Sequence, residues 1–355
     1  MTGPHPATAA VRLAVRRCLG ECDPGDLVLV ACSGGADSLA LAAALAFEAP
    51  KLAVRAGAVV VDHGLQEGSA EVAQRAAGTA RGLPLDPIEV VRVRVPQAPE
   101  GLEAAARSVR YAALDAAAVR HGARLVLLGH TLDDQAETVL LGLTRGAGTR
   151  SLSGMPRARD RFRRPLLGVT RDQTRTSCRV EGLTWWEDPM NADPAFTRVR
   201  ARRALVELER DLGPGVAAAL ARSADQLRQD ADHLDAEAEA AATRLLAAPP
   251  SPVRRGPAED PRRFYIEPAV LLALPQAVRT RVWRRLLAAA GAPAGQVTTR
   301  HTDACDALLT HWHGQGPVHA PGDLRVTRSG GRVSITPAAA VEWVPTPPPE
   351  PADQE

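Results

Sequence analysis

The sequence has few cysteines, and they follow no pattern that would mark a metal or redox protein. There are five, an odd number, and none of them forms a C-x-x-C pair. A disulfide framework, a zinc knuckle or a cysteine-held iron–sulfur cluster therefore has little support. We expect scattered, reduced thiols at Cys18, Cys22, Cys32, Cys178 and Cys305.

Long apolar runs are lacking as well. No run reaches the roughly 20 residues that span a bilayer, because Arg, Asp or Pro interrupts the longer ones. The first residues, MTGPHPATAAVRLAVRR, lack the apolar block of a secretory signal. These features favour a cytoplasmic location and exclude a membrane partner from our expectations.

Lysine is almost absent, since Lys51 is the only one in the chain and nearly all positive charge is arginine. The net charge of +2 does not by itself indicate a nucleic-acid partner. Many arginines fall in three segments, however, at residues 157–179, 198–203 and 279–285. Guanidinium groups bind phosphate through two parallel hydrogen bonds and stack on bases. Two interpretations of these segments are equally open. The arginines contact nucleic-acid phosphates, or they form a solvated surface in a chain whose composition favours arginine.

The sequence does contain a repeated alternation of apolar runs and helical patterns. The apolar runs, typical of buried strands, cover residues 27–32, 52–63, 87–95 and 124–130. The helical patterns that follow them cover residues 39–49, 68–82, 101–122 and 131–146. This alternation predicts an α/β fold with a doubly wound, Rossmann-like parallel sheet, whose ligands bind at the carboxyl ends of the strands. Because SGGADS, DHG and GHTLDD each follow a strand, we expect them to converge on one crevice.

Changes in composition divide the chain into four predicted parts. These are an N-terminal domain at 1–210, a long helix and Pro-rich linker at 211–261, a small α+β C-terminal domain at 262–340, and a disordered tail at 341–355. A helix is expected to start near Phe196. Within the C-terminal domain the pattern predicts helices around 268–290 and 301–312 and a strand pair near 323–336.

The hexapeptide SGGADS, Ser33 to Ser38, is the most informative segment. Its two adjacent glycines allow a tight turn that brings backbone N–H groups against phosphate oxygens. The helix that follows presents its positive dipole end to the same place. The G-K-[ST] ending of a Walker A motif is missing. A plain strand–helix turn is the alternative, but the whole hexapeptide after a buried strand favours phosphate binding.

This loop resembles the PP-loop of the N-type ATP pyrophosphatases, which cleave ATP to AMP and pyrophosphate. The resemblance implies that an oxygen nucleophile attacks the α-phosphate, while Asp37 holds Mg²⁺ on the phosphates and so takes a catalytic role. The ATP contacts that it implies are Ser33, Gly34, Gly35, Ala36, Asp37 and Ser38. Several kinds of synthetase share the loop, so other segments must identify the substrate.

The segment GHTLDDQAETVLLGLTRGAG (129–148) resembles the H-x-x-x-D-x-x-E-T segment of the tRNA(Ile)-lysidine synthetase and two-thiocytidine thiolase families. Asp134 and Glu137 are three residues apart and therefore share a helix face. The resemblance implies that they hold a lysine substrate, which carries two ammonium groups, and that His130 contacts ATP. For Asp133, stabilisation of the helix dipole is the simpler explanation.

Two further segments before residue 115 resemble the lysidine synthetase family. GLEAAARSVRYAAL (101–114) carries Arg107 and Arg110 on one helix face, where the resemblance implies that one or both contact ATP phosphate or the carboxylate of lysine. A surface Glu–Arg pair is the alternative for this helix. VVVDHGL (59–65) places His63 beside the nucleotide by the same resemblance, although a histidine at a strand end is often only a structural polar residue.

The segment WWEDPMNADPAFTRVRARRALVEL (185–208) resembles the E-D-x-x-N…R-x-R-x-R segment of the same family. The resemblance implies catalytic roles in adenylation for Arg198 and Arg200. The family pattern has Asn and Pro where this chain has Thr197 and Leu205. These departures leave open which arginine assists adenylation.

The resemblance covers residues 26–210 and, more weakly, residues 262–340. It implies an ATP-dependent carbon–nitrogen ligase that adenylates the wobble cytidine, position 34, of an isoleucine tRNA with a CAU anticodon. L-lysine then displaces AMP at C2, which changes codon reading from AUG to AUA. The tRNA contacts that we assign from the arginine-rich segments are Arg163, Arg164, Arg171, Arg202 and Arg281, and a homodimer is left open.

Three alternative functions stay open from the sequence. A PP-loop tRNA cytidine thiolase typically needs C-x-x-C pairs, which are missing here. A small-molecule adenylating ligase, such as an NAD or GMP synthetase, leaves the arginine-rich segments unexplained. A non-catalytic RNA-binding protein has no need for the intact Asp37, Asp134, Glu137 and Arg110.

Overall fold

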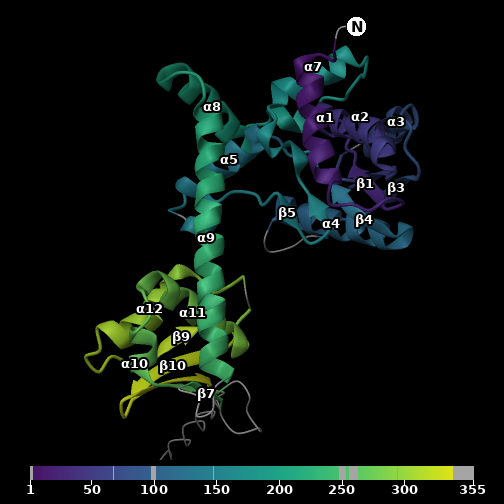
Figure 1. Ribbon diagram of the computed structural model, residues 1–355. Coiled ribbons are helices and arrows are strands. Elements are labelled where there is room, and N and C mark those ends of the chain that lie inside the picture. The colour runs from purple at the N-terminus through teal and green to yellow at the C-terminus, as the bar shows by residue number, and fades with distance from the viewer. Residues whose placement is uncertain are drawn as a thin grey trace, which may run out of the picture. The chain divides into compact units, whose positions relative to one another are not determined.

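The computed structural model describes residues 3–66, 68–96, 101–146, 148–247, 253–255, 263–293 and 295–338. The chain divides into two compact units, Met1–Arg228 and Gln229–Glu355, and the division falls within helix α9 (Val216–Ala247) (Figure 1). No helix in the described part of the chain is long and apolar enough to cross a membrane. The domain boundaries expected at residues 210, 261 and 340 stay predictions.

A six-stranded sheet forms the centre of the first unit, with the order β3-β2-β1-β4-β6-β5. Its strands are β1 (Leu27–Ala31), β2 (Arg55–Asp62), β3 (Ile88–Arg92), β4 (Ala123–Leu127), β5 (Ala158–Arg159) and β6 (Phe162–Arg163). All neighbours are parallel except β5 and β6. Because β1 has β2 on one side and β4 on the other, its carboxyl end is a topological switch point. The predicted fold class is confirmed, and β5 and β6 add an edge that the sequence did not reveal.

Helices cover both faces of this sheet. They are α1 (Pro6–Leu19), α2 (Ala36–Glu48), α3 (Ser69–Arg81), α4 (Leu102–His121) and α7 (Arg171–Val180). Alternate side chains of β1 face opposite sides, so Val28 packs with α1, α2, α3 and α7, and Leu29 packs with α4. Helix α1, which the sequence did not reveal, joins the first of these two cores through Val11, Val15 and Leu19.

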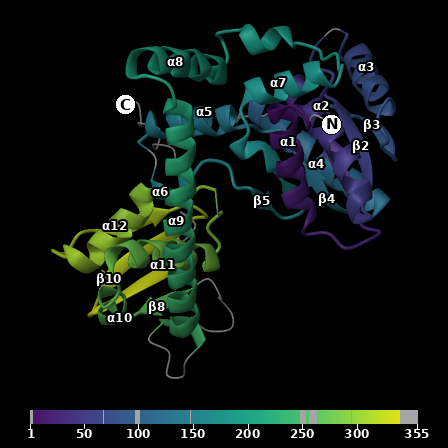
Figure 2. The same ribbon diagram turned by 45° about the horizontal axis from the view of Figure 1, so that its top comes forward.

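Two further helices begin beside the carboxyl end of the sheet. Helix α5 (Leu132–Leu143) starts with a capping box between Thr131 and Asp134, as α7 does between Thr170 and Gln173. Helix α8 (Thr197–Leu212) starts directly after Phe196, as predicted, and packs against α5 (Figure 2). The first unit also contains α6 (Thr149–Leu152) and 3-10 turns at Ala49–Leu52, Pro165–Gly168 and Pro189–Ala192.

The second unit is built on a five-stranded antiparallel sheet with the order β7-β8-β11-β10-β9. Its strands are β7 (Val253–Arg255), β8 (Phe264–Ile266), β9 (Val318–Ala320), β10 (Leu324–Ser329) and β11 (Arg332–Pro337). Its helices are α10 (Pro268–Leu272), α11 (Gln276–Ala289) and α12 (Thr299–Thr310). Trp283 and Phe264 are fully buried and lie in the core that these elements form with the end of α9.

The second unit corrects three details of the expected C-terminal domain. The predicted strand pair exists as β10 and β11, but three strands of three residues each complete the sheet. The helical region around 268–290 holds two helices, because Pro275 caps α11. The Pro-rich segment 248–261 is not a linker throughout, since β7 pairs with β8. The expected disordered tail, 341–355, lies outside the described residues.

Candidate active site

The loop between β1 and α2 has the geometry of an anion-binding turn. Ser33 N–H donates to Ser38 Oγ at 3.1 Å, and Ser38 Oγ–H donates to Gly35 O at 2.9 Å, so the two serines fix the turn. Gly34 has a φ of +81°, which only glycine adopts without strain. Gly35 caps α2 without a side-chain hydrogen bond. The N-terminal amides of α2 therefore face outward, where a phosphate can accept from them.

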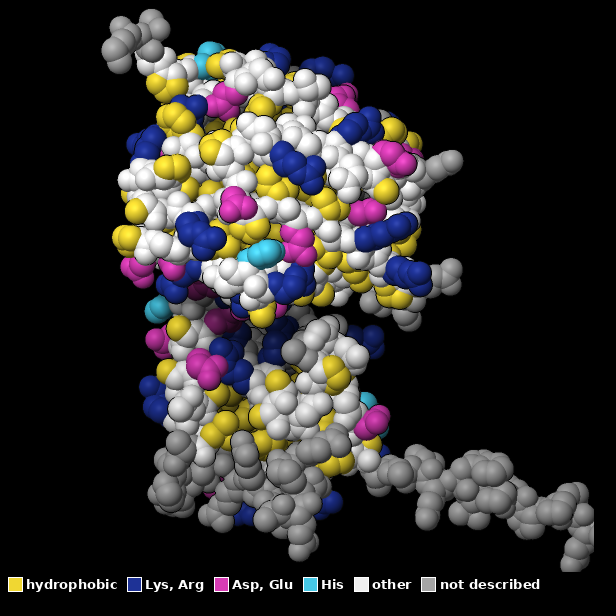
Figure 3. Space-filling view, turned by 90° about the vertical axis from the view of Figure 1, so that its right-hand side faces the viewer, with side chains coloured by type: hydrophobic (Ala, Val, Ile, Leu, Met, Phe, Trp, Pro, Cys, Tyr) yellow, Lys and Arg dark blue, Asp and Glu magenta, His cyan; other side chains and the backbone are white. Residues whose placement is uncertain are grey.

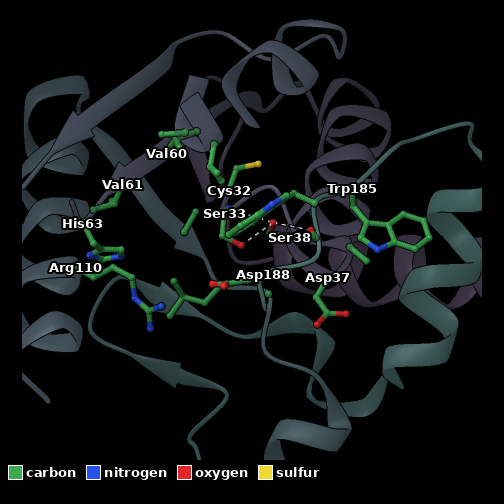
Figure 4. Close-up of a pocket in the computed structure, with 18 of the residues that line it drawn as sticks. Cys32, Ser33, Asp37, Ser38, Val60, Val61, His63, Arg110, Trp185 and Asp188 are labelled. Carbon is green, nitrogen blue, oxygen red and sulfur yellow. Dashed lines mark hydrogen bonds between the residues drawn. The ribbon is translucent and has the colours of Figure 1, made fainter. Parts of the chain in front are cut away.

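This loop forms one wall of a pocket of about 750 Å³ (Figure 4). The ends of three parallel strands contribute to it, with Ser33 after β1, His63 after β2 and His130 after β4. Residues 185–188 form another wall, where Trp186 N–H donates to Gly34 O at 3.0 Å. Figure 4 shows Asp37 and Trp185 on one side of the loop and His63 and Arg110 on the other. The three segments expected to converge thus lie in one pocket.

On the Asp37 side, carboxylates surround the guanidinium of Arg171. Arg171 Nη2–H donates to Asp134 Oδ1 at 2.8 Å and to Glu137 Oε1 at 3.2 Å. Its Nε lies 3.9 Å from Asp37 Oδ2. Its backbone N–H donates to Asp133 Oδ2 at 2.8 Å, which joins the N-terminus of α7 to that of α5. Arg171 thus lines the pocket, and its assignment as a tRNA contact stays a prediction.

Glu137 is the most deeply buried of these carboxylates, with 1% of its surface exposed. Its Oε1 accepts from Arg171 and also, at 2.8 Å, from Nε–H of Arg202 on α8. Its Oε2 is buried and has no hydrogen-bond partner among the described residues. A buried carboxylate oxygen without a partner is costly, and a cationic ligand would satisfy it.

Asp37 and Asp134 have opposite pKa shifts. Burial raises the pKa of Asp37 to about 6, and Asp134 adds to this rise although the Thr174 hydroxyl donates to Asp37 Oδ1 and opposes it. Burial acts in the same direction on Asp134, yet Arg171 and the Thr131 N–H hold the pKa of Asp134 below its usual value. An added cation would therefore favour the ionised form of Asp37 more than that of Asp134.

The surroundings of Asp37 fit a magnesium ion shared with a nucleotide. Mg²⁺ commonly binds through one or two carboxylates, substrate phosphates and water. Asp37 lies at the start of α2, beside the loop that can hold phosphates, and a cation there would offset its burial. Within the described ranges no cluster of three or more His, Cys, Asp or Glu side chains could hold a metal by itself.

The opposite side of the pocket holds half-buried cations. Burial lowers the pKa of Arg110, and the nearby guanidiniums of Arg107, Arg198 and Arg164 lower it further, against the effect of Tyr111. Positive charges held close together in a partly buried place favour the binding of an anion between them. Arg110 lines the pocket itself, whereas Arg107 lines a neighbouring hollow that also includes Tyr111. This side of the pocket therefore suits a phosphate group.

Two neutral histidines lie beside these cations. Burial lowers the pKa of both His63 and His130, that of His130 to about 3, and Arg110 lowers both further. Nδ1 of each ring is buried without a hydrogen-bond partner in the part of the chain that the structure describes. Each ring is thus neutral at physiological pH and has a nitrogen that a ligand can engage.

Three arginines in the first two turns of α8, Arg198, Arg200 and Arg202, have different environments. Arg200 is exposed and donates to Pro194 O and Ala195 O at 2.7 and 2.9 Å, so its guanidinium holds the loop that precedes α8. Arg202 lines the pocket and binds Glu137, although it was expected on tRNA. Arg198 is half-buried and close enough to Arg110 to lower its pKa. Which of these arginines assists adenylation stays a prediction.

The remaining arginines assigned to tRNA are also engaged within the protein. Arg163 donates to Glu21 at 2.8 Å, and Arg281, in the second unit, to Asp235 at 2.8 Å. Arg164 is 3% exposed and donates to Pro156 O, so its assignment as a tRNA contact is corrected to a structural role. On the face of the first unit in the upper part of Figure 3, basic side chains are interspersed with acidic and apolar ones.

Sequence reasoning missed several residues that shape the site. Thr174 binds Asp37 across 137 residues of sequence, so no local pattern indicates it. Trp186 joins the phosphate loop through its backbone, which a motif cannot show. Tyr111 accepts from Arg164 Nη2–H at 2.7 Å and stacks edge-on against Phe162. Its place beside Arg110 in the R-Y motif was a usable signal.

A parallel sheet with a phosphate loop at its switch point defines a PP-loop domain that uses ATP. A family model described as "PP-loop domain" matches residues 10–209, and one described as "TilS substrate binding domain" matches residues 269–334.

Proteins named tRNA(Ile)-lysidine synthase from Streptomyces coelicolor and Thermobifida fusca are 51% and 52% identical to this chain. The matches cover 94% and 95% of this chain and 99% of each relative. A protein of the same name from Leifsonia xyli is 50% identical over 88% of this chain and 91% of its own length. The chain belongs to the tRNA(Ile)-lysidine synthase family.

Proposed function

We propose that this chain attaches L-lysine to C2 of the wobble cytidine, position 34, in an isoleucine tRNA with a CAU anticodon. ATP is converted to AMP and pyrophosphate, and the modified tRNA reads AUA instead of AUG. The names of the relatives support this substrate. The observation that carries the proposal is one pocket whose lining combines a phosphate loop with Asp134, while the buried Glu137 lies behind the lining residues Arg171 and Arg202 and binds both. The loop suits adenylation, and the carboxylates suit an amine substrate.

In the first step the cytidine O2 attacks the α-phosphate and pyrophosphate leaves. The N-terminal amides of α2 bind phosphate oxygens within the turn that Ser33 and Ser38 fix. Arg110 and Arg198 stabilise the negative charge that develops on the α-phosphate. Mg²⁺, held by Asp37, would supply further positive charge beside the pyrophosphate.

In the second step the side-chain amine of lysine attacks C2 of the activated ring and AMP leaves. Asp134 and Glu137 bind an ammonium group of lysine and so orient the amine towards the ring. Since the target base must leave the anticodon stack to enter this pocket, the anticodon loop has to be bound in an opened form.

We assign tRNA binding chiefly to the second unit. Its helix α11 carries Arg281 and Arg285, which donate to Asp235 and Glu239 of α9, and the exposed Arg284. Residues matched by the substrate-binding family model include this helix. Arginines with weak surface partners can exchange them for phosphates, so salt should weaken tRNA binding.

The first step can be tested without lysine. Protein is mixed with Mg²⁺, ATP labelled in its adenine and a CAU-anticodon tRNA transcript. We expect pyrophosphate release with labelled AMP retained on the tRNA, and release of that AMP when lysine is added. A transcript with a changed wobble base should release none. Pyrophosphate release that needs no tRNA would contradict the proposal and point to a small-molecule ligase.

Asp37→Asn provides the matched variant for this assay. It should lower pyrophosphate release at least about 100-fold, because the carboxylate beside the leaving group is lost. Its affinity for tRNA should not change. Asp115→Asn removes a surface carboxylate that pairs with Arg161, and it should behave as the unchanged protein.

The thiolase alternative gains no support from the cysteines. Burial raises the pKa of Cys18, Cys178 and Cys305 to about 12. Sulfur transfer needs an accessible thiolate, and such thiols are protonated and poorly nucleophilic at neutral pH.

A further inference from the structure

The proposed lysine site is occupied by the protein's own cations. Glu137 is 1% exposed, and its Oε1 accepts from both Arg171 and Arg202. Asp134 is nearly buried beneath Arg171, which it binds at 2.8 Å. An incoming ammonium group therefore cannot reach either carboxylate until a guanidinium moves away.

Arg171 is the guanidinium whose movement would affect both carboxylates. Arg202 contacts Glu137 alone among the pocket carboxylates, whereas Arg171 contacts Asp134 and Glu137 and lies 3.9 Å from Asp37. The main chain of Arg171 is held in place. Its N–H donates to Asp133, and Arg171 is the first residue of α7, which starts with a capping box. Its side chain alone can change position.

The place to which Arg171 can move is set by the same geometry. Asp37 stands at the start of α2, where the loop amides can hold phosphates. A bound triphosphate brings several negative charges to the side of Arg171 that faces Asp37. The phosphates of the nucleotide and the carboxylates of Asp134 and Glu137 then compete for the guanidinium of Arg171, which lies between them.

We propose that Arg171 takes the place of the lysine ammonium group in the empty enzyme and moves towards the phosphates when ATP binds, so that Asp134 becomes free for lysine and Glu137 keeps only Arg202 as its partner. Arg171 is thus a positioning residue that couples the two substrates and makes ATP bind before lysine. This inference rests on the proposed function. Such coupling is reciprocal, so bound lysine raises the affinity for ATP by the same factor.

The test measures the binding of radiolabelled lysine by equilibrium dialysis in the absence of tRNA. Each protein is examined with and without Mg²⁺ and α,β-methylene-ATP, which cannot be cleaved at the reacting bond. For the unchanged protein we expect the nucleotide to lower the Kd for lysine at least about tenfold. Arg171→Gln should bind lysine tightly without nucleotide, and the nucleotide should change its Kd less than twofold.

Two further variants control for charge and for general effects on α7. Arg171→Lys keeps a cation between the two sites and should retain the coupling. Arg179→Gln removes an exposed arginine from the same helix and should match the unchanged protein. The reciprocal measurement, α,β-methylene-ATP affinity with and without saturating lysine, needs no variant and should give the same factor.

A lysine Kd that is independent of nucleotide in the unchanged protein would overturn the inference. So would full coupling in Arg171→Gln, or an Arg171→Gln protein that binds lysine more weakly than the unchanged protein without nucleotide. In each of these results lysine still binds, and the proposed function stands. If the unchanged protein bound no lysine under either condition, the proposed function would fail as well.

Discussion

At the scale of single residues, the carboxylates of the pocket owe their roles to their surroundings. Asp37 and Asp134 are the same residue type, yet burial raises the pKa of Asp37 to about 6 while Arg171 holds the pKa of Asp134 low. Asp37 therefore favours a cation shared with phosphate, and Asp134 is already ionised for an amine. Two acids in one site with opposite pKa shifts commonly have distinct roles in an enzyme.

Glu137→Gln tests the lysine site at this scale. The amide keeps the shape of the side chain but removes the negative charge that holds an ammonium group. A hydrogen bond between charged groups contributes roughly 1.5–3 kcal/mol, so the KM for lysine should rise about 10- to 100-fold. The KM for ATP should change little.

Glu181→Gln is the matched control for Glu137→Gln, because Glu181 also pairs with an arginine, Arg12 at 2.6 Å, but does not line the pocket. Its kinetic constants should equal those of the unchanged protein. If Glu137→Gln altered only the KM for ATP, the lysine assignment would be wrong.

His130 gives a pH dependence whose sign follows from its pKa. Burial lowers the pKa of His130 to about 3, below the value near 6.5 that histidine has in an unfolded chain. Between these values the unfolded chain binds a proton that the folded protein does not. This residue therefore contributes a loss of stability as the pH falls from 6.5 towards 3, of at most about 1.4 kcal/mol per pH unit.

Urea unfolding of the protein and of His130→Asn at pH 7, 6 and 5 checks this prediction. The free energy of unfolding should fall more steeply with decreasing pH in the unchanged protein than in the variant. Taking the difference between the two removes the contribution of Asp37, which has the opposite sign. A difference that stayed constant across this range would show that His130 titrates normally in the folded protein.

At the scale of elements, the end of β4 lies directly against the start of α2. A Cβ added to Gly129 would lie 3.2 Å from backbone atoms of Asp37 and Ser38, closer than ordinary contact. Backbone at the start of a helix cannot yield as a flexible side chain can. The small residue before His130 therefore sets the position of the phosphate loop.

Gly129→Ala should displace the phosphate loop. We expect a KM for ATP about tenfold higher and a loss of about 1–3 kcal/mol in unfolding free energy, as for other overpacked sites. Gly78→Ala is the control, since Gly78 lies in α3 and its added Cβ meets nothing within 4 Å. That change should leave the KM for ATP alone and raise stability by up to about 1 kcal/mol.

At the scale of the whole molecule, the buried parallel sheet could be predicted from the sequence, but the short strands and the long-range contacts of the site could not. Strands β1 to β4 are apolar runs followed by helices, so their pattern can be read directly. Strands β5 to β9 have two or three residues, too few to show a period. Arg171 binds Glu137 across 34 residues of sequence, and only the folded structure, which brings the first residue of α7 to α5, reveals that pair.

Separate cores in the two units lead to a prediction about a fragment. The core residues around β1 all belong to residues 1–228, and those around Trp283 all belong to the second unit. A fragment of residues 1–228 should therefore unfold cooperatively and bind ATP as the full chain does. Its affinity for tRNA should fall at least about tenfold, because it lacks α11 and its arginines.

Filter binding with a CAU-anticodon transcript, together with thermal unfolding, would test the fragment. A folded fragment that bound tRNA as tightly as the full chain would place tRNA recognition in the first unit instead.

The most direct test of the account is transfer of radiolabelled lysine to a CAU-anticodon isoleucine tRNA transcript in the presence of ATP, Mg²⁺ and purified protein. We expect label on the tRNA only when ATP is present, and none when the wobble cytidine is replaced. Absence of label while ATP is still cleaved to AMP and pyrophosphate would contradict lysine as the nucleophile, and absence of cleavage as well would contradict catalysis by this pocket.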